Sequence, residues 1–233
     1  MPVALITGAS RGLGRATAHA LAVRGWSLVA DARRQDDLAD ALRGLPDVTA
    51  IAGDVTSPQH RSDLAAAARR FGRLDVLINN ASSLGPSPLP PLRSYELSDL
   101  RRVYETNVLA PLALIQLLTG QLEVAEGAII NVSSDAAVEA YPGWGSYGSS
   151  KAALDQLTAV LAAEEGGLRC YSFDPGDMRT DMHQLAFPGE DISDRPEPES
   201  VVPALLRLLD ERPPSGRYRA VDLAIESPER MQS

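Results

Sequence analysis

The sequence predicts an α/β fold, in which a parallel sheet is covered by helices. Short apolar runs alternate with stretches of helical periodicity along the chain, which is typical of consecutive βαβ units. A glycine-rich turn follows the first apolar run and precedes the first helical stretch. The chain has 233 residues, which suits one domain with a substantial core, and we assign residues 1–233 to a single domain.

Seven apolar runs predict seven strands, and the intervals between them predict helices. One helix begins at Ser57-Pro58, a capping residue followed by proline at the first helical position. Two further helices span about Ser149 to Glu165 and about Ser200 to Asp210. The strands are expected at Val3–Thr7, Ser27–Asp31, Thr49–Ala52, Asp75–Asn79, Ala128–Val132, Leu168–Phe173 and Tyr218–Val221.

Two segments interrupt this alternation. Ser82–Leu92 is rich in proline, and Phe187–Ser200 is rich in proline and acidic residues. Loops of this length in a compact domain are either functional or disordered, and composition alone leaves both readings open. We expect residues 183–200 to form a flexible loop on the substrate side of the domain.

Composition excludes several classes of function. The net charge is −9 with no basic cluster, so we expect no nucleic-acid partner. No apolar run approaches the length of a membrane span, and strand-like residues begin at Val3, which leaves no room for a signal peptide. We therefore expect a cytoplasmic protein. Cys170 is interpreted as a small buried hydrophobe. His19, His60 and His183 are too scattered for a metal site, and we expect exposed positions for them.

The first predicted strand leads into the run Thr7-Gly8-Ala9-Ser10-Arg11-Gly12-Leu13-Gly14. Glycines permit a tight turn and a close backbone approach, and a helix N-terminus offers free N–H groups to a pyrophosphate. The spacing is not that of G-x-G-x-x-G. The position at the first strand–helix junction nevertheless favours dinucleotide binding over a plain connection.

Only one of the 22 basic residues is a lysine, Lys151. In a chain that otherwise uses arginine, this indicates a position where a guanidinium cannot replace an ammonium. Tyr147 lies four residues earlier, which places both side chains on one face of a helix. An ammonium lowers the pKa of a nearby phenol, so the pair is suited to general acid/base catalysis. The alternative is an ordinary surface pair on an amphipathic helix.

Seven motifs in order resemble those of the short-chain dehydrogenase/reductase superfamily over nearly the whole chain. The resemblance implies a three-layer, doubly wound Rossmann fold with a seven-stranded parallel sheet. It also implies hydride transfer between a nicotinamide cofactor and a carbonyl or alcohol. The motifs are Thr7-Gly8-x-x-x-Gly12-x-Gly14, Asp54-Val55, Asn79-Asn80-Ala81, Asn107, Ser134, Tyr147-x-x-x-Lys151 and Pro175-Gly176-x-x-x-Thr180.

The resemblance implies a role for each of four catalytic residues. Tyr147 donates the proton, Lys151 modifies its pKa and holds the nicotinamide ribose, and Ser134 orients the substrate oxygen. Ser133 is the neighbouring alternative, but adjacent strand residues face opposite ways and the spacing from Tyr147 favours Ser134. Similar enzymes use the residue at Asn107 to kink a helix and to link the lysine to bulk water.

The kink at Asn107 also has a backbone argument. Pro111 lies four residues later and has no N–H, so it cannot bond to the Asn107 carbonyl, which is then free to hold a water. The alternative is that Pro111 lies near a helix start and disturbs nothing.

The choice of cofactor depends on the residues after the second strand, Asp31-Ala32-Arg33-Arg34. A carboxylate there binds the ribose diol of NAD, whereas an arginine accommodates the phosphate of NADP. Counting from Gly25, Ala32 stands where NAD-preferring relatives carry aspartate, and Arg33 matches the arginine of NADP-preferring relatives. We therefore expect NADP(H), with NAD(H) as the alternative. The implied cofactor-binding residues are Gly8, Ser10, Arg11, Gly12, Leu13, Gly14, Arg33, Asp54, Val55, Asn80, Ala81, Tyr147, Lys151, Pro175, Gly176, Met178 and Thr180.

Two positions depart from the family pattern: Ser82 replaces the usual glycine after Asn-Asn-Ala, and Asp174 stands where many relatives carry asparagine. The substrate pocket is expected to draw on Leu84, Tyr141, Trp144, Asp177, Met178 and Met182, with Phe187 as a further candidate. Trp144 and Met182 could equally be core residues. Apolar and aromatic walls favour an uncharged carbonyl compound.

We therefore expect an NADPH-dependent carbonyl reductase that forms a homodimer or homotetramer through the helices carrying Asn107 and Lys151. An NAD-dependent alcohol dehydrogenase is the alternative within the same class. A catalytically silent NADP(H)-sensing regulator, or a structural protein that kept only the fold, are alternatives from other classes.

Overall fold

The computed structural model describes residues 1–225 and contains one seven-stranded sheet in the order β3-β2-β1-β4-β5-β6-β7. Every neighbouring pair of strands is parallel. The order reverses between β1 and β4, which creates the crevice where doubly wound sheets bind ligands. The strands are β1 (Val3–Ile6), β2 (Ser27–Ala32), β3 (Val48–Ala52), β4 (Val76–Asn79), β5 (Ala128–Val132), β6 (Arg169–Asp174) and β7 (Gly216–Arg219).

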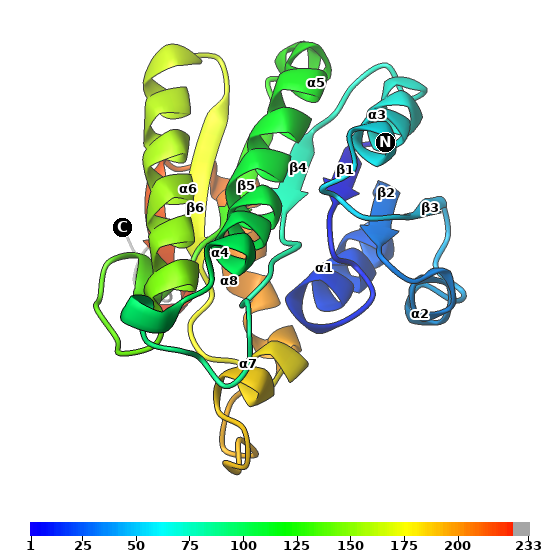
Figure 1. Ribbon diagram of the computed structural model, residues 1–233. Coiled ribbons are helices and arrows are strands. Elements are labelled where there is room, and N and C mark those ends of the chain that lie inside the picture. The colour runs from blue at the N-terminus through cyan, green and yellow to red at the C-terminus, as the bar shows by residue number, and fades with distance from the viewer. Residues whose placement is uncertain (226–233) are drawn as a thin grey trace.

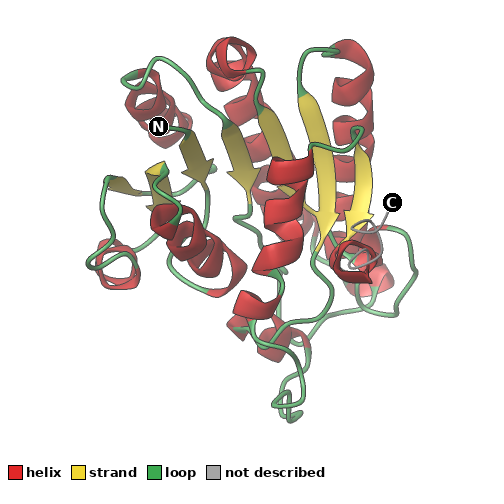
Figure 2. Ribbon diagram, turned by 180° about the vertical axis from the view of Figure 1, so that it is seen from behind, coloured by secondary structure: helices red, strands yellow, loops and turns green. Residues whose placement is uncertain are grey.

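Helices cover both faces of the sheet, so the predicted three-layer fold is confirmed (Figure 1). Helices α3 (Pro58–Arg69), α5 (Ala110–Ala125) and α6 (Gly145–Glu164) cover one face. The opposite face, turned toward the viewer in Figure 2, carries α1 (Gly12–Val23), α2 (Gln35–Ala41) and α8 (Val202–Glu211). Shorter helices are α4 (Leu97–Tyr104), α7 (Asp181–Ala186) and α9 (Ala220–Ile225).

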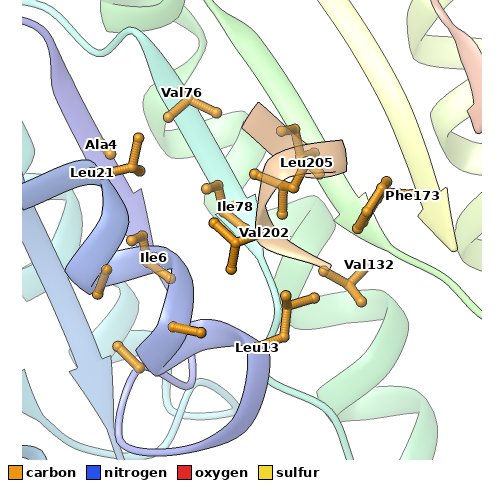
Figure 3. Close-up of a cluster of buried hydrophobic side chains, with 14 of the residues drawn as sticks. Ala4, Ile6, Leu13, Leu21, Val76, Ile78, Val132, Phe173, Val202 and Leu205 are labelled. Carbon is orange, nitrogen blue, oxygen red and sulfur yellow. The ribbon is translucent and has the colours of Figure 1, made fainter. Parts of the chain in front are cut away.

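Each helical layer buries its own apolar core against the sheet. Figure 3 shows one core, in which Leu21 of α1 and Leu205 of α8 pack over Ile6 and Ile78. These four side chains are at most 1% exposed. Each such side chain contributes about 1.5–3 kcal/mol to folding. The two cores fix the strands and therefore the positions of the loops at their carboxyl ends.

Six predicted strands are found within one residue of their expected ends, and the helix that begins at Ser57-Pro58 is confirmed. The last strand begins two residues earlier than expected, because Gly216 already pairs with Tyr171 of β6. Helix α6 begins at Gly145, four residues before its predicted start. Its glycines suggest a turn, but Gly148 serves close packing, since a Cβ there would lie 2.5 Å from the Ala136 carbonyl oxygen.

The expectation that no segment reaches the length of a membrane span is wrong. A π-helical turn, Glu105–Leu109, joins α4 and α5 into a continuous helix, Leu97–Ala125, which is long and apolar enough by length and composition alone. In this fold, however, it is a partly buried core helix. Its side chains Leu114, Ile115, Leu118 and Leu122 are at most 2% exposed.

The segment from α7 to α8 lies beneath the carboxyl ends of the strands (Figure 1). Thr180 Oγ1 accepts a hydrogen bond from His183 N and so caps α7. Beyond α7 the segment is held by an ion pair between Arg179 and Glu197, and Arg195 contacts Asp177. Residues 183–200 therefore begin in a helix, and their flexibility remains a prediction.

Candidate active site

The glycine-rich turn is tied to the end of β4. Thr7 Oγ1 accepts hydrogen bonds of 3.0 Å from Asn80 N and from Ala81 N, and Asn80 Nδ2 donates to the Thr7 carbonyl. A Cβ on Gly14 would lie 2.4 Å from the Gly8 carbonyl oxygen, so only glycine fits there. Gly8 itself has a φ of +69°, a backbone conformation that favours glycine.

The turn also fits an anionic ligand. Gly12 opens α1, and the preceding residue, Arg11, provides no side-chain cap for the first N–H groups of this helix. A Cβ on Gly12 would meet only Thr180 Cγ2, at 3.5 Å, so the turn faces the Thr180 segment across a small gap. Uncapped N–H groups and the positive end of the helix dipole suit a dinucleotide pyrophosphate. Arg11 forms an exposed ion pair of 2.8 Å with Asp181 of α7.

A buried carboxylate supports the turn from β2. Asp31, which is 1% exposed, accepts a 2.8 Å hydrogen bond from Gly8 N, and its other oxygen lies 2.9 Å from His60 Nε2. Both oxygens of Asp31 therefore already have hydrogen-bond partners within the protein. Arg33, by contrast, is exposed and has no ion-pair partner within residues 1–225. Arg34 pairs with Asp37 on α2.

The exposed positions expected for the three histidines are wrong, because none of them is exposed. His60 is 6% exposed, because its ring fills the space above Gly53, where a Cβ would lie 2.3 Å from His60 Nδ1. The side chain of His183 is 9% exposed, and its ring lies 4.9 Å from that of Phe187. His19 is half-buried, with Nε2 2.7 Å from the Ala41 carbonyl oxygen.

The Asp54-Val55 motif forms the turn after β3. Asp54 is exposed, and its Oδ1 accepts hydrogen bonds of 2.8 Å from both the N–H and the hydroxyl of Thr56. Val55 is buried. The turn therefore presents the Asp54 carboxylate at the carboxyl end of β3 while Val55 anchors it.

Tyr147 and Lys151 lie on the face of α6 that is turned toward β5. They are 8% and 2% exposed. Lys151 Nζ donates a 2.6 Å hydrogen bond to the Val132 carbonyl and lies 5.5 Å from the centroid of the Tyr147 ring. The lone lysine is thus a buried ammonium fixed beside a buried phenol.

Burial dominates the pKa of both groups. It raises the pKa of Tyr147, against the lowering effect of side-chain hydrogen bonds with Ser134 and Ser82, while the Asp174 and Asp135 carboxylates raise it further. Burial lowers the pKa of Lys151 from 10.5 to about 8, and the nearby Asp155 carboxylate acts in the opposite direction. We expected Lys151 to bring the pKa of Tyr147 toward neutrality; instead the pKa is raised, chiefly by burial. The phenol is therefore protonated at neutral pH.

Ser134 is hydrogen-bonded to Tyr147, whereas Ser133 is not. The Ser134 hydroxyl hydrogen-bonds Tyr147, donates to Asp135 Oδ1 at 2.9 Å and accepts from Ala136 N at 3.2 Å. Ser133 is 2% exposed, and its hydroxyl has no hydrogen-bond partner within the described part of the chain. Both serines follow the end of β5 at Val132, and only Ser134 contacts Tyr147.

Asn107 clamps the loop that follows β4. It is fully buried; its Oδ1 accepts from Ser83 N at 2.8 Å and from Ser82 Oγ at 3.2 Å, and its Nδ2 donates to Ser150 Oγ at 3.0 Å. The π-helical turn lies immediately before Pro111. Because proline has no N–H, the helix cannot keep its regular hydrogen bonding there and forms a π-helical turn, so Pro111 does disturb the helix.

The Pro175-Gly176 turn leads from β6 toward α7. Asp174 Oδ1 accepts a 3.0 Å hydrogen bond from Gly176 N, and Gly176 has a φ of +72°. Met178 packs against the core below α1 and α8. This path places Thr180 opposite the glycine-rich turn, so the two predicted cofactor motifs do meet at one edge of the sheet.

An apolar cluster lies beside Tyr147. Leu84, Trp144 and Met182 pack around it, and the Trp144 ring centroid is 5.7 Å from that of Tyr147 and 5.9 Å from that of Phe187. Tyr141 lies at the exposed edge of this cluster, 6.4 Å from Trp144, and its hydroxyl lies 2.7 Å from Glu139 Oε2 and 3.0 Å from Asp135 Oδ2. Three of the predicted pocket residues therefore gather at Tyr147, and Tyr141 marks the rim.

Several residues of the site were not predicted. A charged residue in an otherwise apolar strand, Asp31, was a usable signal for the scaffold it forms with His60. Ser82 was noticed only as a departure, yet its hydroxyl bonds both Tyr147 and Asn107. Arg217, which donates to the Ser134 carbonyl, gave no sequence signal because it lies 83 residues away.

Comparisons with known proteins agree with this geometry. The family described as short chain dehydrogenase matches residues 2–191. Sepiapterin reductase of Mus musculus is 34% identical over 201 residues, covering 79% of this chain and 77% of that protein. The structure of a short chain dehydrogenase from Pseudomonas syringae has a TM-score of 0.88 and 35% identity, with 94% of each chain covered.

A short chain dehydrogenase from Shigella flexneri, solved in complex with NADP, has a TM-score of 0.86 and 27% identity, and covers 94% of this chain and 97% of its own. The match to the family model covers well over half of the sequence and includes the glycine-rich turn, Tyr147 and Lys151. The chain therefore belongs to the short-chain dehydrogenase/reductase family of oxidoreductases.

Proposed function

We propose that this oxidoreductase is an NADPH-dependent carbonyl reductase in which Tyr147 protonates the substrate oxygen. The observation that carries the proposal is a buried, protonated phenol, hydrogen-bonded by Ser134 beside an apolar cluster. Reduction of a carbonyl requires an acid at this position, whereas oxidation of an alcohol requires its conjugate base. A tyrosine hydroxyl is protonated at neutral pH, which suits the first direction.

The residues present fit a nicotinamide dinucleotide. The uncapped N-terminus of α1 and the glycine-rich turn would hold the pyrophosphate, Asp54 and Val55 would flank the adenine, and Lys151 would hold the nicotinamide ribose. When bound, the reduced nicotinamide supplies the hydride that adds to the carbonyl carbon. Tyr147 gives its hydroxyl proton to the carbonyl oxygen, and the product is the alcohol.

The chain's other residues would prepare this proton transfer. Ser134 lies within reach of the Tyr147 hydroxyl and would hold the substrate oxygen there. Asn107 fixes the Ser82–Ser83 backbone, and with it the second hydroxyl near Tyr147. Lys151, held by the Val132 carbonyl, would return a proton to the tyrosine through water near Asn107.

Charge at the end of β2 supports NADP(H) over NAD(H). Asp31 is committed to Gly8 and His60, Ala32 carries no charge, and the Arg33 guanidinium is exposed there. An exposed guanidinium can bind the phosphate of NADP through its planar fork, whereas NAD offers it only hydroxyls. The NADP bound to the Shigella flexneri relative also supports this choice.

The competing functions predict different behaviour. An NAD-dependent alcohol dehydrogenase would use the same residues in reverse but gives Arg33 no role. A catalytically silent NADP(H) sensor would need no proton donor and therefore gives Tyr147 no role. Leu109 and Val160, exposed on the helices that carry Asn107 and Lys151, support a homodimer or homotetramer as part of the proposal. A cytoplasmic location is proposed as well.

The proposal is tested by following oxidation of NADPH and of NADH with a panel of ketones, aldehydes and quinones. We expect turnover with at least one uncharged carbonyl compound and a higher kcat/KM with NADPH. Tight NADPH binding without turnover over the whole panel would favour the sensor, and faster turnover with NADH would reject the cofactor assignment.

A further inference from the structure

One arginine joins three elements directly behind the site. Arg217 of β7 donates hydrogen bonds of 2.9 Å to the Ser134 carbonyl, 2.8 Å to Asp174 Oδ2 and 3.1 Å to Asp155 Oδ2. The Asp174 and Asp155 side chains are only 4% and 16% exposed, and that of Arg217 is 25% exposed. These interactions are largely shielded from water, where charge-assisted hydrogen bonds are strongest.

Both carboxylates also lie close to residues of the candidate active site. Asp174 Oδ1 accepts from Gly176 N in the turn beside the predicted nicotinamide site. Asp155 lies four residues after Lys151 on α6, so the two side chains share a helix face. After burial, which dominates, Asp155 raises the pKa of Lys151 and Asp174 raises that of Tyr147. Arg217 is bonded to both of these carboxylates.

The other charged residues near Tyr147 and Arg217 make weaker contacts with them. Asp135 also faces Tyr147, but Arg217 does not bond it. On the other side, Arg217 faces Asp222 of α9, which is about half exposed and pairs with Arg219. Arg219 faces Asp174 and Glu139 only at longer range, and its own side chain is 57% exposed. Arg217 is therefore the cation best placed to balance Asp155 and Asp174.

We propose that Arg217 is a positioning residue for carbonyl reduction, which holds the Ser134 backbone in place and balances the Asp155 and Asp174 carboxylates facing Lys151 and Tyr147. The negative charge of Asp174 at the end of β6 thus has Arg217 as its partner. The inference rests on the proposed roles of Tyr147 and Ser134 in turnover, but its electrostatic part can be measured without a substrate.

The single lysine makes that measurement direct. In protein labelled with ¹³C-lysine, prepared without a lysine-containing tag, only Lys151 contributes a signal, and its chemical shift reports its titration. Arg217→Gln leaves the Asp155 carboxylate unbalanced, so the midpoint, about 8 in the wild type, should rise by about half a unit or more. Adding Asp155→Asn should return it to the wild-type value or below. Arg219→Gln, which removes an equal charge two residues away, should leave it unchanged.

Kinetics test the contact with Ser134. Arg217→Gln and Arg217→Lys should each lower kcat by about tenfold or more, because even a small displacement of a substrate-orienting group is costly and one ammonium cannot reproduce three bonds of a guanidinium fork. The KM for NADPH should stay within about twofold, since the glycine-rich turn is untouched. Arg219→Gln should retain wild-type kcat.

A Lys151 midpoint in Arg217→Gln that coincides with that of Arg219→Gln would overturn the proposal. So would a wild-type kcat in Arg217→Lys, which decides the matter if the glutamine variant does not fold. A wild-type protein that reduces no carbonyl compound would instead reject the proposed function, while the lysine titration would still test Arg217.

Discussion

Lys151 Nζ lies 5.5 Å from the centroid of the Tyr147 ring and is anchored by a 2.6 Å hydrogen bond to the Val132 carbonyl. Both side chains are buried, so neither is an ordinary surface residue.

Lys151→Arg should lower kcat by about a hundredfold or more, although it keeps the positive charge. Lys151 is 2% exposed, and a planar guanidinium cannot take the place of its ammonium without displacing Tyr147 or Val132. Steady-state kinetics with NADPH and a responsive carbonyl compound measure the effect. An arginine variant with wild-type kcat would show that the lone lysine is incidental.

Replacing Lys151 by methionine should change how stability depends on pH. The lysine has a pKa of about 8 in the folded protein and 10.5 in the unfolded chain, so below pH 8 burying the ammonium costs about 3 kcal/mol. Between pH 8 and 10.5 the unfolded chain binds more protons, so stability of the wild type rises with pH through this group. Urea unfolding of both proteins over this range should show the wild type gaining on Lys151→Met; a constant or falling difference contradicts the assignment.

Arg33→Ala should weaken NADPH binding by about tenfold and leave NADH binding within about twofold, because only NADPH offers a phosphate to the guanidinium. Arg34→Ala is the matched control, since Arg34 is already paired with Asp37. Fluorescence titration gives the four dissociation constants. An equal loss of both cofactors, or the same loss in Arg34→Ala, would show that Arg33 does not select the phosphate.

Asp31→Ala should destabilise the protein by about 1–3 kcal/mol, because it leaves Gly8 N and His60 without their buried partner. The same change should weaken NADPH binding, since the Gly8 N–H belongs to the predicted pyrophosphate turn. Asp31→Asn keeps an oxygen for Gly8 N and should lose less in both respects. The account fails here if the alanine and asparagine variants are equally stable and bind NADPH equally.

The fold was predictable from sequence because its signals are local. Alternating apolar runs placed six strands within one residue, and proline after Ser57 marked the start of α3. The seventh strand was misplaced because its first residue, Gly216, belongs to the ladder only through Tyr171, a contact distant in sequence. Likewise, the helix beginning at Gly145 was hidden by a glycine that serves close packing.

The site was predictable where a motif carries its own spacing, as for Tyr147 and Lys151. It was not predictable where function depends on burial or on distant partners. The sequence suggested that Lys151 lowers the pKa of Tyr147, but desolvation, which no motif records, raises it. The partners of Asp31 and Asp174, His60 and Arg217, lie 29 and 43 residues away and became visible only in the folded chain.

The most direct test of Tyr147 as the proton donor is a single-turnover measurement. Enzyme loaded with NADPH is mixed with a carbonyl compound that the wild type reduces, and loss of absorbance at the nicotinamide band is followed for the wild type and for Tyr147→Phe. The account predicts that the variant binds NADPH with a dissociation constant within about threefold of the wild type but oxidises it at least about a thousandfold more slowly. Oxidation at the wild-type rate in Tyr147→Phe would contradict the central claim.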